Sequence, residues 1–305
     1  MRENHALLEF LEERVEAEDI LKHEPMSKHT SFRIGGEADL FVRVPSQKAL
    51  SEILKYCNQV GQEYFILGKG TNLLVGDKGY RGMILQLSQQ MADIRVEGNT
   101  LFAQTGAPLP LVAKVAAQNG LSGLEFASGI PGSLGGAIVM NAGAYDGEMK
   151  QVIRYVKVLD QMGEEMNLDN DTMEFGYRTS IIKDRPFVAV EAEMRLTPAP
   201  KDEIFAKMEE LNQRRRDKQP LEYPSAGSTF KRPEGHFAGK LIMDAGLRGL
   251  RVGDAQVSEK HCGFVVNIGN ATAEDVVELM EEIQYRVKKQ LGVRLEPEVI
   301  RIGEF

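Results

Sequence analysis

The sequence contains little cysteine. Cys57 and Cys262 are its two thiols among 305 residues, and they form no CxxC pair. Two isolated thiols exclude a disulfide framework and a thiolate zinc cluster, and they are typical of the reducing cytosol. The five histidines show no HxH or HExxH spacing, so no metal site is expected either. We therefore predict a cytoplasmic protein without a bound metal.

Long hydrophobic runs are missing as well. At the N-terminus, Leu7, Leu8, Leu11 and Val15 recur at helical spacing among many carboxylates. A signal peptide needs an uninterrupted apolar core, so this pattern predicts an amphipathic surface helix. No stretch is long and apolar enough to span a bilayer, and we expect no membrane insertion.

Positive charge is also in deficit. The chain has 37 basic and 45 acidic residues, a net charge of −8. This balance argues against a general nucleic-acid binder and against a protein that coats anionic membranes. Residues 201–251 differ, with eleven basic and eight acidic residues. That local excess favours a site for an anion, while a solvated surface is the alternative for any single cation in it.

Helices and strands are mixed along the chain. Helices are expected over residues 46–61, 110–118, 201–217 and 272–291, the last with a capping box at Thr272 and Asp275. Strands are expected over residues 39–44, 64–67, 83–87, 94–96, 101–104, 152–159, 187–196, 265–268 and 299–302. Because the order lacks strict βαβ alternation, the predicted fold class is α+β, with residues 197–200 as a linker.

Glycine is abundant, and 14 of the 30 glycines fall in two windows, residues 61–82 and 120–147. The first window holds the loop Leu67-Gly68-Lys69-Gly70-Thr71-Asn72-Leu73. Its paired glycines let successive N–H groups point at a phosphate, but it matches neither the P-loop nor the GxGxxG fingerprint. From the residues alone, a tight strand-to-strand turn is at least as good an interpretation as a ligand loop.

The second window holds Ser128-Gly129-Ile130-Pro131-Gly132-Ser133-Leu134-Gly135-Gly136, a rigid segment with few side chains. A helix is expected to begin with residues 137–140. N–H groups at such a start, with the helix dipole behind them, suit a pyrophosphate. A buried turn packed on the core is the alternative. Two such loops in one chain favour a dinucleotide cofactor more than either loop does alone.

Six short motifs, in order along residues 25–302, together resemble the UDP-N-acetylenolpyruvoylglucosamine reductases (UDP-N-acetylmuramate dehydrogenases). They are His29-Thr30-Ser31-Phe32-Arg33-Ile34-Gly35-Gly36, the loop at 68–75, the segment at 129–145, Phe175-Gly176-Tyr177-Arg178-Thr179-Ser180, Pro224-Ser225-Ala226-Gly227-Ser228-Thr229-Phe230-Lys231, and Glu296-Pro297-Glu298-Val299. Six motifs in register are far more specific than one. The short stretch between Arg178 and Ser228 is similar to the subfamily that lacks an extra tyrosine-bearing substrate loop. Cys262 stands where the family would have alanine, and we interpret it as a packing residue.

The resemblance implies a two-lobed FAD-binding domain of the vanillyl-alcohol-oxidase/PCMH type with a smaller α+β substrate domain. Residues 1–90 and 91–200 would be the FAD-binding lobes, residues 201–292 the substrate domain, and residues 293–305 a tail that returns to the lobes. FAD contacts are implied for Gly68, Lys69, Gly70, Thr71, Asn72, Leu73, Ser128, Gly129, Ile130, Pro131, Gly132, Ser133, Gly135, Gly136, Asn141, Gly143 and Ala144.

The implied reaction has two halves. NADPH reduces FAD and leaves; UDP-N-acetylglucosamine enolpyruvate then receives a hydride from flavin N5 at the enol-ether carbon distal to its carboxylate, which yields UDP-N-acetylmuramate, a peptidoglycan precursor. Arg178 would stabilise the charge that builds up on the carboxylate, Ser228 would protonate the adjacent carbon, and Glu298 would act as a neutral hydrogen-bond donor. Without the family, each has a simpler interpretation: a surface ion pair, a turn serine and a structural carboxylate.

Substrate contacts are implied for Tyr145, Lys231, Arg232 and Lys240, of which the three cations would hold the diphosphate. Two alternatives remain at this stage: another FAD-linked oxidoreductase on the same fold, acting on an alcohol or hydroxy acid, and a nucleotide-sugar binder that has lost its flavin. An oxidase has no need of Ser228 as a proton donor, and a protein without flavin would lack flavin absorption bands.

Overall fold

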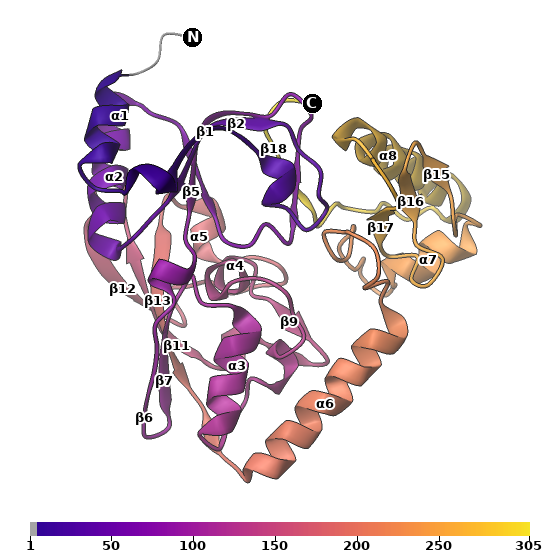
Figure 1. Cartoon of the computed structure of the whole chain (residues 1–305). Coiled ribbons are helices and arrows are strands. Elements are labelled where there is room, and N and C mark those ends of the chain that lie inside the picture. Colours follow the sequence, from indigo (N-terminus) through magenta and orange to yellow (C-terminus); the bar gives the residue numbers. More distant parts are fainter. Residues whose placement is uncertain (1–4) are drawn as a thin grey trace. The chain divides into compact units, whose positions relative to one another are not determined.

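A computed structural model describes residues 5–305 of the chain, and the labels of Figure 1 are used below. The residues pack into two units. Of the described residues, unit 1 comprises 5–22, Leu40–Lys69 and Gly82–Gln213, and unit 2 comprises His23–Asp39, Gly70–Arg81 and Arg214–Phe305. Both units mix helices with strands, which confirms the α+β class.

The elements of unit 1, or those that begin in it, are helices α1 (His5–Glu12), α2 (Gln47–Val60), α3 (Leu109–Gln118), α4 (Leu134–Val139), α5 (Ile181–Asp184) and α6 (Lys201–Lys218), with strands β1 (Ile20–Pro25), β3 (Tyr64–Leu67), β6 (Ile94–Glu97), β7 (Thr100–Gln104), β8 (Leu121–Ser122), β9 (Gly143–Ala144), β10 (Gly147–Glu148), β11 (Ile153–Leu159), β12 (Glu165–Asp169), β13 (Val188–Arg195) and β14 (Thr197–Pro198). Unit 2 holds β4 (Leu73–Val75), α7 (Ala238–Asp244), β15 (Arg251–Val252), β16 (Ala255–Val257), β17 (Val265–Asn267), α8 (Ala273–Leu291) and β18 (Ile300–Ile302). Strands β2 (Glu37–Arg43) and β5 (Tyr80–Gln86) begin in unit 2 and end in unit 1.

A five-stranded antiparallel sheet, in the order β12-β11-β13-β7-β6, is the centre of unit 1. Alternate residues face opposite sides of a strand, and one row, Val156, Ala192 and Ala103, is buried. Helices α3 and α4 cover this face (Figure 1), and their apolar side chains complete the core. The second glycine loop is therefore carried by a sheet that has one buried, apolar face.

A second core of unit 1 packs α1 and α2 together, as Figure 1 shows. Ser46 caps α2 by accepting a hydrogen bond from the N–H of Ala49, and Gly61 ends it with a left-handed φ of 67°. The amphipathic N-terminal helix is confirmed, but Val15 lies beyond it, because α1 ends at Glu12. Arg14 there donates a hydrogen bond to the carbonyl of Phe10, one of the acceptors a helix end leaves unpaired.

A four-stranded sheet has the order β1-β2-β5-β3, and β3 pairs with β5 in parallel. The expected linker at 197–200 is different: Thr197 and Pro198 form β14, which pairs with β8. The prolines predicted a linker, but two residue pairs between β14 and β8 hold this segment in a short sheet.

Unit 2 is built on the antiparallel sheet β15-β16-β17, against which α7 and α8 pack. The predicted capping box of α8 is present, with Thr272 and Asp275 bonded reciprocally. Strand β18 pairs in parallel with β4, with Ile300 opposite Leu73. The last strand of the chain is thereby fixed to the end of the first glycine loop.

Candidate functional site

The first glycine loop joins β3 to β4, and two of its glycines are required by their surroundings. A Cβ at Gly68 would overlap the hydroxyl of Ser133, and a Cβ at Gly70 would overlap the carbonyl of His29. Gly70 also has a left-handed φ of 58°. The structure confirms the strand-to-strand connection, in which two glycines lie where a side chain would not fit. The ligand role of the loop stays a prediction.

The second glycine loop is bonded to the connection between β7 and α3. The N–H of Leu134 donates to Ala107 O at 2.8 Å, and the N–H of Gly135 donates to Thr105 O at 2.9 Å. The hydroxyl of Ser133 accepts from the N–H of Gly136 at 3.4 Å, so Ser133 is the N-cap of α4.

This geometry corrects the interpretation of the helix start. Helix α4 begins at Leu134 and not at Ala137, because Ser133 caps it. The N–H groups of its first turn already have protein acceptors, so they are not the expected pyrophosphate donors. Within residues 5–305, the N–H groups of Gly129 and Gly132, just before the helix, make no hydrogen bond to protein.

The two loops meet at Gly68 and Ser133, both in unit 1. Gly68, Gly129 and Gly132 carry no side chain, and in the described part of the chain the N–H groups of Gly129 and Gly132 are unpaired in protein, which fits an anionic group such as FAD. The individual FAD contacts inferred from the sequence stay predictions.

A tight hairpin follows α4. Strands β9 and β10 pair Ala144 with Gly147, and the two residues between them, Tyr145 and Asp146, have left-handed φ of 53° and 67°. Two positive φ angles define a type I′ turn, which usually carries asparagine or glycine. Gly147 is necessary because a Cβ there would overlap the ring of Phe126. The backbone thus holds Tyr145 at the tip of a strained hairpin.

Arg178 lies in a two-residue turn that Gly176 and Thr179 close with two backbone hydrogen bonds of 3.1 and 3.4 Å. Its φ is 58°, uncommon for a residue with a long side chain. The half-buried guanidinium donates from Nη2 to Gly143 O at 3.3 Å and lies 5.1 Å from the centre of the Tyr177 ring. The turn and the β9-β10 hairpin, both in unit 1, are therefore adjacent.

Ser228 and Glu298 lie in unit 2, and the structure brings them together. The N–H of Glu298 donates to the carbonyl of Thr229 at 2.9 Å, and Phe230 bridges to Pro297. Ser228 is exposed and follows Gly227, whose φ is 76°. The segments that carry the serine and the glutamate are therefore joined by backbone hydrogen bonds of the residues next to them.

Thr229 is the residue that sequence reasoning missed. It is 1% exposed, and its N–H donates to Gly263 O at 2.8 Å while its hydroxyl accepts from Val265 N at 2.8 Å. Together with its bond from Glu298, these fix the peptide that carries Ser228. The signal available in the sequence was a threonine directly after the candidate catalytic serine.

The predicted diphosphate cations differ in their surroundings. Lys231 lies 3.5 Å from the carboxylate of Glu296, and Arg232 stacks 3.9 Å from the centre of the Phe237 ring. Lys240, on α7, forms an ion pair of 2.7 Å with Asp244 one turn along. Lys231 and Arg232 lie three and four residues after Ser228, and both lysines have a carboxylate partner.

Burial shifts the pKa values of both cysteine thiols and of one histidine. Burial raises the pKa of Cys57 to about 12 and also raises the pKa of Cys262, so both are inert packing residues, as predicted for Cys262. Burial lowers the pKa of His261, whose Nδ1 accepts from Gly263 N at 3.1 Å. In residues 5–305 no group of three metal-ligating side chains occurs, and no helix there has the length and apolarity of a membrane span.

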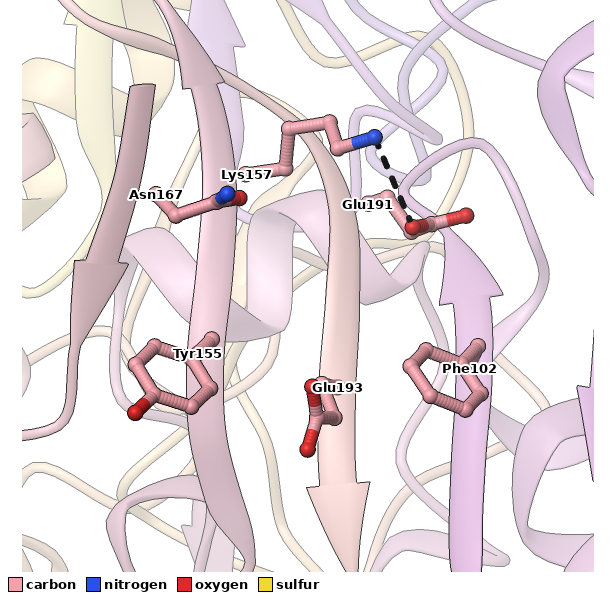
Figure 2. Close-up of a pocket in the computed structure, with 6 residues that line it drawn as sticks. All are labelled: Phe102, Tyr155, Lys157, Asn167, Glu191 and Glu193. Atoms are coloured by element: carbon pink, nitrogen blue, oxygen red, sulfur yellow. Dashed lines mark ion pairs between the residues drawn. The ribbon is translucent and has the colours of Figure 1, made fainter. Parts of the chain in front are cut away.

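A separate pocket lies on the solvent face of the five-stranded sheet, as Figure 2 shows. Its lining comes from β7, β11, β12 and β13 and includes Tyr155, Glu193 and Phe102 in one row. Lys157 lies 3.8 Å from Glu191, and Arg154 lies 3.0 Å from Glu193. Its charges neutralise one another, and it contains none of the predicted site residues.

Two parts of the chain that hold predicted site residues match known protein families. Residues 38–169 match a family described as FAD binding domain, and residues 219–302 match the C-terminal domain of UDP-N-acetylenolpyruvoylglucosamine reductase. The curated protein of that name from Agathobacter rectalis is 50% identical, covering 99% of this chain and 100% of the relative. The one from Caldanaerobacter subterraneus subsp. tengcongensis is 51% identical, covering 98% of both chains.

Among solved structures, the reductase from Thermus caldophilus matches with a TM-score of 0.80 and 34% identity, over 92% of this chain and 98% of that one. The FAD-binding match overlaps both glycine loops, and the C-terminal match contains Ser228 and Glu298. The chain is an FAD-dependent oxidoreductase and belongs to the UDP-N-acetylenolpyruvoylglucosamine reductase family.

Proposed function

We propose that the chain reduces UDP-N-acetylglucosamine enolpyruvate to UDP-N-acetylmuramate, with NADPH as the source of electrons. The names of its relatives and its two family matches support this substrate. The observation that carries the proposal is the pairing of the Ser228 segment with the Glu298 segment, since a proton donor and a second polar group beside it are what reduction of an enol ether requires. The reaction would take place in the cytoplasm.

Bound FAD would supply the hydride, and the protein supplies position, charge and a proton. Reduction adds one hydride and one proton across the carbon–carbon double bond. The hydride goes to the carbon distal to the carboxylate, and the electron pair of the double bond moves to the adjacent carbon. The Ser228 hydroxyl then gives its proton to that carbon, where a weak acid suffices because a carbanion is a strong base. Thr229 would hold the serine in position through its three hydrogen bonds.

Arg178 would grip the substrate carboxylate. A guanidinium remains charged and offers two parallel donors, so it stabilises the extra negative charge that the carboxylate acquires in the transition state. Glu298 would donate a hydrogen bond as a neutral acid, because an anionic substrate disfavours a second nearby negative charge.

The cofactor would lie along the two glycine loops. The N–H groups of Gly129 and Gly132, and not those of the first turn of α4, are the donors that we propose for the FAD pyrophosphate. Lys69, Thr71, Asn72 and Leu73 would flank it from the first loop, and Gly143 and Ala144 from the hairpin. The side-chain amide of Asn141 is bonded to protein groups, so a cofactor contact there would use its backbone.

Four side chains are proposed to bind the substrate. Lys231, Arg232 and Lys240 are the cations proposed for the diphosphate. To contribute, Lys231 would have to exchange its partner Glu296, and Lys240 its partner Asp244. Tyr145, at the hairpin tip, is the proposed aromatic contact. We propose residues 1–90 and 91–200 as FAD-binding lobes, residues 201–292 as the substrate domain and residues 293–305 as a returning tail.

Product analysis tests this proposal. The purified protein with NADPH and the enolpyruvyl nucleotide should yield a nucleotide heavier by two hydrogen atoms, and the protein should show flavin bands near about 370 and 450 nm. An unchanged nucleotide alongside intact flavin bands would reject this substrate and favour another oxidoreductase of the fold. Missing bands after incubation with FAD would favour a binder without flavin.

A further inference from the structure

Asn141 has a buried side-chain amide whose oxygen and nitrogen both form hydrogen bonds with protein groups. The residue is 1% exposed, and its backbone φ is 40°. Its Oδ1 accepts from the N–H of Lys150 at 2.9 Å. Its Nδ2 donates to the carbonyl of Gly176 at 3.0 Å and to the carboxylate of Glu148 at 3.1 Å.

The partners fix which end of the amide is which. A backbone N–H only donates and a carbonyl only accepts, so the oxygen must face Lys150 and the nitrogen must face Gly176. An aspartate of the same shape would keep the first bond and lose the other two. Its second oxygen would then face two acceptors, which is repulsive.

The bond to Gly176 reaches the turn that carries Arg178. Gly176 pairs with Thr179 to close that turn, and on its far side the buried Ser180 hydroxyl donates to Val139 O at 2.9 Å. The amide of Asn141 therefore holds the backbone from which the Arg178 side chain extends, in a conformation with positive φ that the sequence does not favour locally.

The bond to Glu148 reaches the other end of the same side chain. Glu148 pairs with Gly143 in the β9-β10 hairpin, and Gly143 O accepts from the Arg178 guanidinium. One amide thus connects the turn at the base of Arg178 with the hairpin that receives its head group.

We propose that Asn141 is a positioning residue that sets the orientation of the Arg178 guanidinium. This inference rests on the role proposed for Arg178. A left-handed backbone alone would be satisfied by glycine, whereas positioning requires the amide. Asn141 then affects only the half-reaction in which Arg178 meets the substrate carboxylate.

The variants that test this are Asn141→Asp, which preserves shape and loses the two donor bonds, and Asn141→Gly, which preserves the backbone and loses all three bonds. Asn170→Asp is the matched control. The Asn170 amide also donates two hydrogen bonds to backbone carbonyls of unit 1, those of Lys150 at 2.8 Å and Ile153 at 2.7 Å. Neither of these bonds reaches the turn that carries Arg178.

In stopped-flow absorbance, the reoxidation rate of each variant is compared with its own rate of flavin reduction by NADPH, because the positioning of Arg178 matters only for the substrate step. Reoxidation by the enolpyruvyl nucleotide should slow about 10- to 100-fold in Asn141→Asp and Asn141→Gly, as expected for a misplaced catalytic group. It should remain normal in Asn170→Asp. In an Arg178→Ala background, Asn141→Asp should slow flavin reoxidation further by less than about twofold, because the effects of residues that act as a unit are not additive.

Hydrogen exchange of the protein without substrate gives a readout besides activity. Amides 176–180 should exchange faster in both Asn141 variants and at the wild-type rate in Asn170→Asp. If Asn141→Asp does not fold, Asn141→Gly carries the test alone. Wild-type reoxidation in both Asn141 variants, or effects that multiply fully with Arg178→Ala, would overturn the positioning role. Failure of the proposed function itself would look different. Either the wild-type protein would show no flavin reoxidation by this nucleotide, or Arg178→Ala would reoxidise its flavin at the wild-type rate.

Discussion

The side-chain amide of Asn72 donates a hydrogen bond to the carbonyl oxygen of Glu298 at 3.1 Å, across 226 positions of sequence. The carbonyl of Asn72 in turn accepts from the N–H of Ile300 at 3.0 Å. Since the N–H of Glu298 is bonded to Thr229, the backbone of Glu298 is held on one side by the first glycine loop and on the other by the Ser228 segment. One residue therefore links the proposed cofactor loop to the proposed proton donor.

Replacing Ser228 should separate the two half-reactions. Ser228→Ala should reduce its flavin with NADPH at the wild-type rate and lose about 10²- to 10⁴-fold in reoxidation by the enolpyruvyl nucleotide, because only the second step needs the proton. Single-turnover stopped flow measures both rates. Ser27→Ala, a half-buried serine of the same unit, is the control and should be normal. A matching loss in flavin reduction would refute the role of Ser228 as proton donor.

Adding a methyl group at Gly68 should weaken FAD binding. The Cβ of Gly68→Ala would displace the Ser133 hydroxyl and with it the cap of α4. We expect a lower ratio of absorbance at about 450 nm to that at 280 nm after purification, with partial recovery in Gly68→Ala/Ser133→Gly, where the overlap is relieved. Gly98→Asn, in an open hairpin turn with a φ of 60°, is the control. Full flavin content in Gly68→Ala would show that the two glycine loops do not form the FAD-binding site.

Asp77 should stabilise the C-terminal helix. Its two carboxylate oxygens accept hydrogen bonds from the N–H groups of Ala273 at 2.8 Å and Glu274 at 3.0 Å, at the start of α8. Asp77→Ala should lower the free energy of unfolding by about 1–2 kcal/mol, the usual cost of losing a helix cap. Urea denaturation measures this, with exposed Asp171→Ala as the control. Equal midpoints for the two variants would rule out the capping role.

The pH dependence of stability should include a contribution from His261. Burial lowers its pKa in the folded state, so the unfolded chain binds the proton more readily. The stability it contributes is present above the unfolded pKa of about 6.5 and is lost as the pH falls through and below it. Urea midpoints between pH 8 and pH 5.5 should therefore fall less in His261→Gln than in wild type. An identical fall in both proteins would mean that His261 is not the responsible group.

The sequence predicted local features well, because their causes are local. The helix at 46–61, the strands at 94–96 and 101–104 and the capping box of α8 follow from residues a few positions apart. The family resemblance was confirmed because six separate motifs had to agree.

Other features depend on residues that only the fold brings together. Asp77 caps a helix 196 positions away, and Asn72 holds Glu298. The start of α4 was misplaced because Ser133 acts as its cap, while the glycines that follow have low helix propensity. The amide network of Asn141 could not be foreseen, since its partners at 148, 150 and 176 are loop and turn residues without periodic pattern.

Anaerobic mixing of NADPH-reduced protein with UDP-N-acetylglucosamine enolpyruvate tests the account most directly. The flavin band at about 450 nm should return in a single turnover, as UDP-N-acetylmuramate forms in equal amount. Flavin that remains reduced with this nucleotide, yet is reoxidised by oxygen, would contradict the proposed function.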